Sequence, residues 1–560
     1  MKRFCSILVL CFVYVGCYTS AQNDSIERVV TVEREFKPII KQTGKIMAEP
    51  ILYVPALKPA EVSYSSYLSP LSNGYNLSEL GYSSLNFVMP KPLNGFLRGG
   101  VGHNNTVFDF SYRISDKKGT YLDIYANHLG KWGKKTLSFT QAGLNFSKSF
   151  SGVDLFFDVN GKNTFFTRYG RYFSYTDLAK GKGTWSISHY GDFSPSDKMN
   201  LWEIDTRLGV RSLPKQEVQY LVQTGYEAFV MGEVATEHQI NSRAMVDWHR
   251  NEHHVGADLV VQNRLYSSRQ MDWTLVSNNG NDTILQNHHV VKVEPYYVYN
   301  GNRFNIHAGI NVDLVFGKGK VCLPSPNVTF EAQLAKKWLA LYGGAVGDYM
   351  LTSVRDNFHF NHFLHPELEV TDAHNRTYVP VDAFLGFKIR PHNDMLLDIY
   401  AHYVLTKYDV FYNQDTEGFF TLVSSDHQRW QIGGKFDYHY QDIVNIHLDG
   451  HYTYYWKITD IVHAYYRPSW EVNFRVDAKI NSKISLYSDN YFAGGRYALV
   501  GGAPLLLRPT IDLNIGAQYN VNKWLSCYLQ LNNYLNRKHD FLYGYQTDGI
   551  NFVAGVTWSF

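Results

Sequence analysis

Histidine and carboxylate residues are most concentrated in one short stretch of this 560-residue chain. The stretch contains His359, His362, His365, Glu367, Glu369, Asp372 and His374. Imidazole and carboxylate groups bind zinc and other transition metals, but neighbouring residues must also hold these side chains in place. A spacing of three residues brings His359, His362 and His365 together only on a helix or in a tightly folded loop. These three histidines are therefore the metal-ligand candidates, although we expect the protein to hold neither a metal nor another cofactor.

Motifs of hydrolytic and nucleotide-dependent enzymes are missing from the sequence. It contains no G-x-S-x-G elbow, no H-E-x-x-H pair and no phosphate-binding P-loop. Alternate polar residues such as His447, Asp449 and His451 offer acid and base groups. Any water-filled, polar-lined interior contains many such neighbours, so their presence does not indicate catalysis. We predict that the protein is not an enzyme and has no catalytic residues.

The segments that would position these side chains alternate strictly between apolar and polar residues. From 443 to 456, one face carries Val444, Ile446, Leu448, Gly450, Tyr452, Tyr454 and Trp456, and the other carries Asn445, His447, Asp449, His451 and Thr453. Segments 304–316 and 511–520 repeat the pattern. Strands of this length, apolar on one face and polar on the other, are typical of transmembrane β-barrels. A large secreted sandwich or propeller is the alternative, but its strands would be shorter and its turns more even in length.

Composition and charge narrow the class of protein further. The chain is 45% hydrophobic and 19% charged, which is too apolar for a disordered protein and too polar for a bundle of membrane helices. Its 53 Lys and Arg oppose 51 Asp and Glu. Without Lys2 and Arg3 of a removable leader, the balance is 51 − 51 = 0. A neutral chain gives no reason to expect nucleic-acid binding.

Residues 1–21 have the three parts of a secretory signal peptide: a basic pair, an apolar stretch and a small-residue cleavage site ending at Ala21. Lipidation at Cys17 is the alternative. Beyond this leader no segment reaches the ~18 to 20 apolar residues of a spanning helix. Removal of the leader leaves Cys322 and Cys527, which we expect to be free thiols.

Connections between the expected strands alternate in length. Counted back from the C-terminus, the long ones are 537–547, 496–507, 457–467, 406–426 and 350–376, and short ones such as 522–523 and 481–482 lie between them. Bacterial barrels have long outer loops and short periplasmic turns. If 165–198 is an outer loop, the alternation holds from residue 95 to the C-terminus. We therefore predict an all-β protein, a transmembrane antiparallel β-barrel of about 22 strands.

The C-terminal residues alternate up to a terminal aromatic residue. Phe552, Val556, Trp558 and Phe560 lie on one face of the expected last strand. The pattern resembles the signal by which outer-membrane barrels are recognised for insertion. We predict that these residues are read by a barrel-insertion machinery.

The final strands also resemble those of a known family. Segments 529–537 (LQLNNYLNR), 543–545 (YGY) and 549–560 (GINFVAGVTWSF) look like the closing strands of TonB-dependent outer-membrane receptors. Residues 95–102 (GFLRGGVG) and 361–366 (NHFLHP) are similar to a plug-less branch of receptor-like barrels. The resemblance implies an outer-membrane barrel related to solute uptake.

The segment 22–94 departs from this family. Its 94 − 21 = 73 residues are too few for the long folded plug that such receptors insert into their barrels. Near its start, Val29, Val30, Thr31 and Val32 resemble the TonB box, a short segment that pairs as an added strand with the energising protein TonB. The alternative is an ordinary β-prone stretch that continues to Ile40. The Pro-rich and Tyr/Ser-rich remainder indicates extended chain, in the periplasm or within the barrel lumen.

These observations predict three parts: a signal peptide (1–21), an N-terminal periplasmic or lumen-filling segment (22–94) and a barrel (95–560). We predict a protein of a Gram-negative-type outer membrane that serves uptake or passage of a solute. Its expected partners are outer-membrane lipid, the insertion machinery, and TonB or another periplasmic or outer-membrane protein. The alternative is a structural or assembly subunit that docks a surface protein or works with an export or insertion machine.

Overall fold

The computed structural model describes residues 94–560 except for 117–118, 134, 168–197, 214–215, 233–234, 268–286, 318, 336–337, 365–375, 415–419, 442 and 501–502. All described residues belong to one compact unit, Lys37–Phe560. The expected signal peptide, the TonB-box-like residues Val29, Val30, Thr31 and Val32, and the N-terminal segment up to residue 93 lie outside the described residues.

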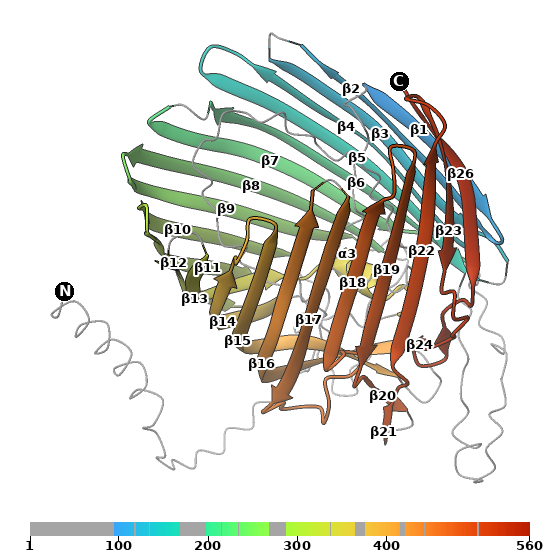
Figure 1. The fold of residues 1–560 in the computed structure, drawn as a ribbon. Helices are drawn as coiled ribbons and strands as arrows, with labels where there is room; N and C mark the ends of the chain where they lie inside the picture. The colour runs from blue at the N-terminus through green and yellow to red at the C-terminus, as the bar shows by residue number, and fades with distance from the viewer. Residues whose placement is uncertain are drawn as a thin grey trace. The chain divides into compact units, whose positions relative to one another are not determined.

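The unit is built around one 22-stranded antiparallel sheet (Figure 1). Its strands are β1 (Gly95–Gly102), β2 (Asn105–Ser115), β3 (Thr120–Lys131), β4 (Leu137–Ser149), β5 (Val153–Thr167), β6 (Lys198–Ser212), β7 (Val218–Met231), β8 (Ala235–Arg250), β9 (His253–Ser267), β10 (His288–Asn300), β11 (Phe304–Gly317), β12 (Gly319–Ala335), β13 (Leu339–Leu351), β14 (Arg376–Ile389), β15 (Met395–Gln414), β16 (Phe420–Tyr440), β17 (Val444–Trp456), β18 (Trp470–Lys479), β19 (Ile484–Gly494), β22 (Thr510–Asn520), β23 (Leu525–Asn532) and β26 (Asn551–Ser559). Four short strands and a helix lie in connections: β20 (Tyr497–Val500), β21 (Ala503–Leu506), β24 (Asp540–Leu542), β25 (Tyr545–Gln546) and α3 (Val354–Phe360).

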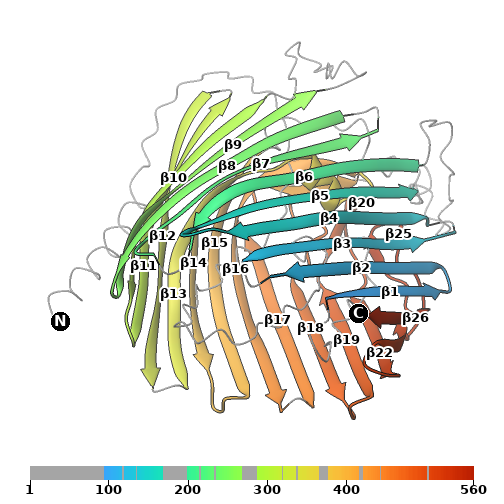
Figure 2. The ribbon, with the colours of Figure 1, turned by 90° about the horizontal axis from the view of Figure 1, so that it is seen from above.

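The first strand closes the sheet into a ring. β1 pairs with β2 along one edge and with β26 along the other, with Leu97 opposite Trp558 and Gly99 opposite Val556. Seen from above, the barrel strands follow one another around this ring in chain order (Figure 2). The closed barrel of 22 strands confirms the predicted fold class. Closure also gives each of the 22 barrel strands a hydrogen-bonded neighbour on both sides.

The barrel wall reverses the burial pattern of a soluble protein. Large apolar residues on its outer face are exposed, among them Leu529 and Val556, whereas Asp512 and Asn514 on the inner face are buried. Inward charges are paired across strands, as in the contact of Arg243 with Asp258. An apolar outer face with a polar inner face is what a barrel in lipid requires, because the lipid solvates only the apolar side chains.

Aromatic residues fit over glycines on the inner face of the wall. Seven such pairs lie directly opposite each other on neighbouring strands: Tyr125 with Gly143, Phe156 with Gly209, Tyr296 with Gly256, Tyr342 with Gly386, Tyr400 with Gly433, Tyr487 with Gly516, and Tyr528 with Gly555. A Cβ added to any of these glycines would lie within 2.0 to 2.6 Å of its partner ring. The glycines therefore provide the space that the rings occupy, and each ring covers backbone that no side chain would otherwise shield.

Connections differ between the two ends of the barrel. At one end, here called the turn end, they range from two residues (251–252) to five (390–394). At the other, the loop end, they include 168–197, 352–375, 457–469 and 533–550. The expected long loop 406–426 is wrong in extent, because β15 continues to Gln414 and β16 begins at Phe420. Both faces of these strand ends are covered, so the apolar–polar alternation disappears there.

Two smaller expectations concern helices and thiols. Within the described ranges no helix has the length and hydropathy of a membrane span. Cys322 and Cys527 are both free and exposed, as predicted.

Candidate functional site

A short helix begins the group of connections that covers the loop end. The Ser353 hydroxyl accepts a hydrogen bond from the Asp356 backbone N–H at 2.8 Å, and the Asp356 carboxylate accepts one from the Ser353 N–H at 2.9 Å. This reciprocal capping box starts α3 and satisfies two backbone donors. The Asn361 N–H donates to the Asn357 carbonyl at 2.9 Å and ends the helix. The local sequence is therefore sufficient to place a helical turn directly after β13.

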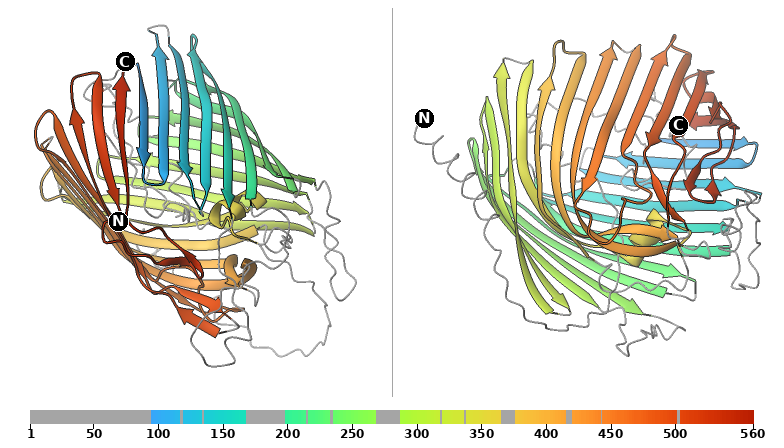
Figure 3. Two further views of the ribbon diagram at one scale, coloured as in Figure 1. Left: turned by 90° about the vertical axis from the view of Figure 1, so that its right-hand side faces the viewer. Right: turned by 90° about the horizontal axis from the view of Figure 1, so that it is seen from below.

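Residues four positions apart give α3 two faces. Val354 and Phe358 form an apolar face and are almost fully buried. Arg355 and His359 form a basic face. The helix thus carries both an apolar contact surface and two cationic groups into the barrel, where Figure 3 shows it within the ring of strands.

The basic face reaches acids on the wall formed by β6 and β7. The Arg355 guanidinium lies 2.7 Å from Asp205 and 2.7 Å from Glu227. His359 Nε2 lies 2.7 Å from the Glu203 carboxylate, which is itself buried. These acids precede their partners by 128 to 156 residues (355 − 227 and 359 − 203), and a buried carboxylate is costly without a cation beside it. The helix and the wall therefore stabilise each other.

Two further contacts attach the start of the helix. The Val354 N–H donates to the buried carboxylate of Glu237 at 2.7 Å. Arg264 donates to the Leu351 carbonyl at 3.2 Å and lies 3.5 Å from Glu237. The helix is thereby bound to β8 and β9 as well as to β6 and β7.

The pKa values of the helix residues reflect this burial. Burial opposes the charge of Arg355, but Asp356, Glu227 and Asp205 outweigh it and raise its pKa. Burial, with His359 nearby, lowers the pKa of His362 to about 3. His362 Nδ1 has no hydrogen-bond partner within the described part of the chain. His362 is therefore neutral in this structure and packs edge-on against Phe166, with ring centroids 5.2 Å apart.

One apolar cluster joins α3 to both sides of the barrel. Its members are Phe166, Leu201, Phe229, Met231, Val354, Phe358, Leu364, Val410, Tyr412, Phe420, Leu422, Tyr465, Tyr466, Ala498, Leu507, Leu542, Tyr543 and Tyr545. They come from β5, β6 and β7 on one side, from β15 and β16 on another, and from the connections between. We call α3 and the connections 457–469, 495–509 and 533–550, packed on this cluster, the loop-end cap. It crosses the lumen rather than lining it.

A buried ion pair attaches the connection 457–469 to the wall. Arg467 lies 2.6 Å from one Asp409 oxygen and 3.0 Å from the other, and it donates to the Val410 carbonyl at 2.7 Å. Its guanidinium also lies over the Phe411 ring, 4.2 Å from the centroid. Two parallel hydrogen bonds to one carboxylate fix both position and direction, which is why Arg rather than Lys suits this place.

Aromatic stacking joins the remaining connections of the cap. Phe363 stacks on Tyr545 with centroids 4.1 Å apart, and His463 stacks on Tyr497 at 3.9 Å. The Asn533 amide donates to the carbonyls of Arg537 and Asp548, at 2.7 and 2.8 Å. Each connection thus contacts another connection or the wall, and together they form a packed layer.

The candidate residues from the sequence fall in different places. His359 and His362 both belong to the cap, with ring centroids 6.5 Å apart, but His359 contacts an acid and His362 packs against Phe166. His365 lies outside the described residues. Whether these histidines bind a metal stays a prediction.

The C-terminal candidates lie on the last strand. Phe552, Val556 and Trp558 point outward from β26 and are exposed, and Phe560 packs against Trp558 with centroids 5.0 Å apart. Their role as an insertion signal stays a prediction.

Sequence reasoning missed the partners of the cap. The Ser353-x-x-Asp356 pattern and the two faces of 354–359 were readable as a capped helix. The acids that receive it follow ordinary strand alternation on β6 and β7, so no local signal marks Glu203, Asp205 or Glu227 as its partners.

Comparison with known proteins places this barrel among solved structures. No family model matches the sequence, and no curated protein matches it significantly. The structure is similar to the ferric enterobactin receptor of Pseudomonas aeruginosa, with a TM-score of 0.61 and 11% identity over 83% of this chain and 81% of the receptor.

Two other solved structures give the same result. The siderophore receptor PirA of Acinetobacter baumannii matches with a TM-score of 0.61 and 9% identity over 85% of this chain and 81% of PirA. The copper transporter OprC matches with a TM-score of 0.59 and 11% identity over 83% of this chain and 80% of OprC. At such low identity the likeness establishes the fold, and the described part of the chain has the barrel fold of TonB-dependent siderophore and copper receptors.

Proposed function

We propose that this protein is an outer-membrane barrel for uptake or passage of a solute, and that its loop-end cap closes the route. The observation that carries the proposal is that α3, which follows β13, reaches the wall at β6 and β7 through Arg355 to Asp205 and Glu227. A barrel of this size without an obstruction would be a wide hole in a protective membrane. The cap supplies an obstruction made from the barrel's own connections.

The outer-membrane location rests on three features. The outer face of the wall is apolar and suits lipid. Residues 1–21 would direct export, and Phe552, Val556, Trp558 and Phe560 would be read by the insertion machinery. Membrane fractionation of a Gram-negative host is the direct measurement, with loss of outer-membrane signal expected when Phe560 is deleted.

Segment 22–94 would act at the turn end of the barrel, the periplasmic end of the proposed path for solute. If Val29, Val30, Thr31 and Val32 pair with TonB as an added strand, deletion of 22–40 abolishes energy-dependent uptake while the barrel still inserts. Unchanged uptake with loss of a co-purifying protein would instead support the docking or assembly subunit.

Conductance in a planar bilayer tests whether the cap closes the lumen. Four proteins are compared: the mature chain, the chain without 22–94, and each of these with Arg355→Glu. The substitution places a carboxylate beside Asp205 and Glu227, so like charges should displace α3. We expect the truncated barrel to stay closed and its Arg355→Glu variant to conduct.

A matched control keeps this result specific to the buried contacts of α3. Arg508→Glu makes the same charge change at an exposed position of the loop end. It should leave conductance unchanged. If truncation alone gave a large conductance, segment 22–94 would be the obstruction. If the truncated Arg355→Glu barrel did not conduct, the lumen would not carry solute, and the docking or assembly role would be supported instead.

A further inference from the structure

A second group of chemically capable side chains lies at the turn end, on the hairpin of β8 and β9. The two-residue turn 251–252 sets the register, which puts His249 directly opposite His254. Asp247 is two residues from His249, on the same face of β8. The neighbouring residues Val246 and Trp248 are exposed on the outer face, so all three side chains face the lumen.

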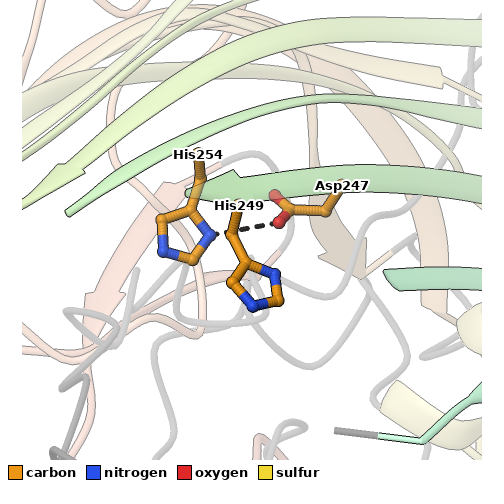
Figure 4. A group of neighbouring side chains, drawn as sticks. All are labelled: Asp247, His249 and His254. Carbon is orange, nitrogen blue, oxygen red and sulfur yellow. Dashed lines mark hydrogen bonds and ion pairs between the residues drawn. The ribbon is translucent and has the colours of Figure 1, made fainter. Parts of the chain in front are cut away.

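The three side chains converge (Figure 4). One ligand atom from each of Asp247, His249 and His254 lies within 4.8 Å of the others. His254 Nδ1 is already 3.1 Å from Asp247 Oδ1, and the two imidazoles are stacked with centroids 5.4 Å apart. His249 Nδ1 is buried with no hydrogen-bond partner among the described residues.

Neighbouring residues hold this arrangement in place. Gly256 lies opposite Asp247 and has no side chain, so the Tyr296 ring occupies the space; an added Cβ would lie 2.4 Å from that ring. The Tyr296 hydroxyl then donates to the second Asp247 oxygen at 2.9 Å. The Asn300 amide lies 3.3 Å from His254 Nε2. One ligand carboxylate and one ligand imidazole therefore have an orienting partner each, as metal ligands usually do.

We propose that Asp247, His249 and His254 bind one divalent transition-metal ion of the Cu²⁺ or Zn²⁺ type. Two imidazole nitrogens and one carboxylate oxygen suit these ions, whereas Mg²⁺ and Ca²⁺ take mainly oxygen ligands. Ligand atoms around such an ion lie about 3.3 Å apart in tetrahedral geometry, given metal–ligand distances of about 2.0 Å. The His254–Asp247 separation already matches, and the ligand atom of His249 lies no more than 4.8 Å from the other two.

The proton on His254 can be rearranged when the ion binds. With Nδ1 donating to Asp247, Nε2 accepts from the Asn300 amide N–H. When Nδ1 binds a metal, the proton moves to Nε2, and Asn300 accepts it after turning its amide over. The ring thus keeps a partner in both forms.

The sequence contained the necessary signal. Asp-x-His, followed by a second His five positions later across a two-residue turn, puts all three ligands on one face of a hairpin. The turn length is the decisive part of this signal, because it fixes which residues of β8 and β9 lie opposite each other.

Metal titration of the full barrel tests the proposal. The mature chain, purified without a polyhistidine tag and stripped with chelator, is titrated with Zn²⁺ by calorimetry and with Cu²⁺ by electron paramagnetic resonance. We expect one site with two coupled nitrogens. His249→Ala and His254→Ala should each abolish that site or reduce it to one nitrogen, and Tyr296→Phe should weaken affinity by about tenfold or more.

Matched controls separate this site from the other histidines. His402→Ala removes a lumen-facing imidazole that hydrogen-bonds to Asp382 at 2.9 Å, and it should leave the titration unchanged. Heat-modifiable migration on gels reports whether each variant is folded. Equal binding by the wild type and by a His249→Ala/His254→Ala variant would overturn the proposal, as would replacement of Zn²⁺ by Mg²⁺ or Ca²⁺ at similar concentration.

Discussion

The barrel wall and the loop-end cap bury opposite kinds of side chain. On the wall, Leu529 is 53% exposed while Asp512 is 4% exposed. In the cap, Phe358 and Leu542 are each 1% exposed. Apolar side chains are therefore stabilised in two different ways in one chain. Lipid solvates those on the outer face of the wall, whereas those of the cap are stabilised by exclusion of water.

This difference determines what holds each region together. Wall strands form long backbone ladders with both neighbours, so the fold of the wall does not depend on any one side chain. The cap consists mainly of irregular connections, which have few backbone ladders of their own. It depends instead on a few buried contacts, Arg467 with Asp409 and Arg355 with Asp205 and Glu227. Single substitutions should therefore affect the cap more than the wall.

The largest effect is expected for Arg467→Ala in the cap. It leaves the fully buried Asp409 carboxylate without its cation, and loss of one partner of a buried pair costs about 3 to 5 kcal/mol. Hydrogen exchange of backbone amides in 457–469 should speed up accordingly, with exchange in β17 unchanged. Arg508→Ala, at an exposed position of the same end, is the control. Similar exchange in both variants would mean that the buried pair does not hold this connection.

On the wall, Ile515→Arg tests the lipid-facing assignment. Ile515 is exposed on the outer face near the middle of β22, and an arginine at the bilayer midplane costs about 2 to 4 kcal/mol. Gln518→Arg places the same residue on the polar inner face and should cost much less. Urea unfolding from phospholipid vesicles gives both values. Equal losses would contradict the assignment of the two faces.

Residues 443–456 show why the wall was predictable from the sequence. Apolar and polar residues alternate along this segment because one face of the strand contacts lipid and the other contacts the polar lumen. The short turns then show which strands are neighbours. The cap offers no such period. Val410, Phe411 and Tyr412 are consecutive and all buried, because Val410 and Tyr412 belong to the apolar cluster while Arg467 and the rings of His427 and Tyr455 contact Phe411. A run of consecutive buried residues lacks the alternation that indicates a strand. For this reason the sequence predicts a loop over 406–426.

The partners within the cap are a separate matter. Arg355 contacts Asp205, which precedes it by 150 residues. Neither residue differs in local sequence from other charged residues of the lumen. Their contact follows from the position of β6 and β13 around the ring, which requires the complete strand order. The metal-ligand hairpin of 247–254 is the opposite case, since its geometry is local and a two-residue turn is sufficient to derive it.

A pH dependence should distinguish the cap from the wall. The pKa of His362 is about 3 in the closed cap, against 6.5 for an exposed histidine. As pH falls below 6.5, the open form binds a proton that the closed form excludes, so the stabilisation present above pH 6.5 declines between pH 6.5 and 3. At pH 5 the loss is about 2 kcal/mol.

Hydrogen exchange of α3 at pH 7 and pH 5, corrected for the intrinsic pH dependence of exchange, measures this loss. His362→Phe keeps a ring beside Phe166 but cannot titrate, so its cap should open equally at both pH values apart from effects of other groups. Wall strands such as β4 should show no comparable change. A wild type and a His362→Phe variant with the same pH response would exclude His362 as the cause.

The smallest effect is expected where a methyl group is added to the wall. A Cβ at Gly516 would lie 2.0 Å from the Tyr487 ring, so Gly516→Ala must displace that ring and should cost about 1 to 3 kcal/mol. Gly99→Ala adds the same methyl group where no atom lies within 4 Å, and should be neutral or stabilise by up to about 1 kcal/mol. Urea unfolding in vesicles compares the two. If both substitutions were neutral, the rings would be loosely held and the aromatic–glycine pairs would not order the wall. A cost at Gly516 alone would show that the wall, despite its long backbone ladders, contains side-chain packing as specific as that of the cap.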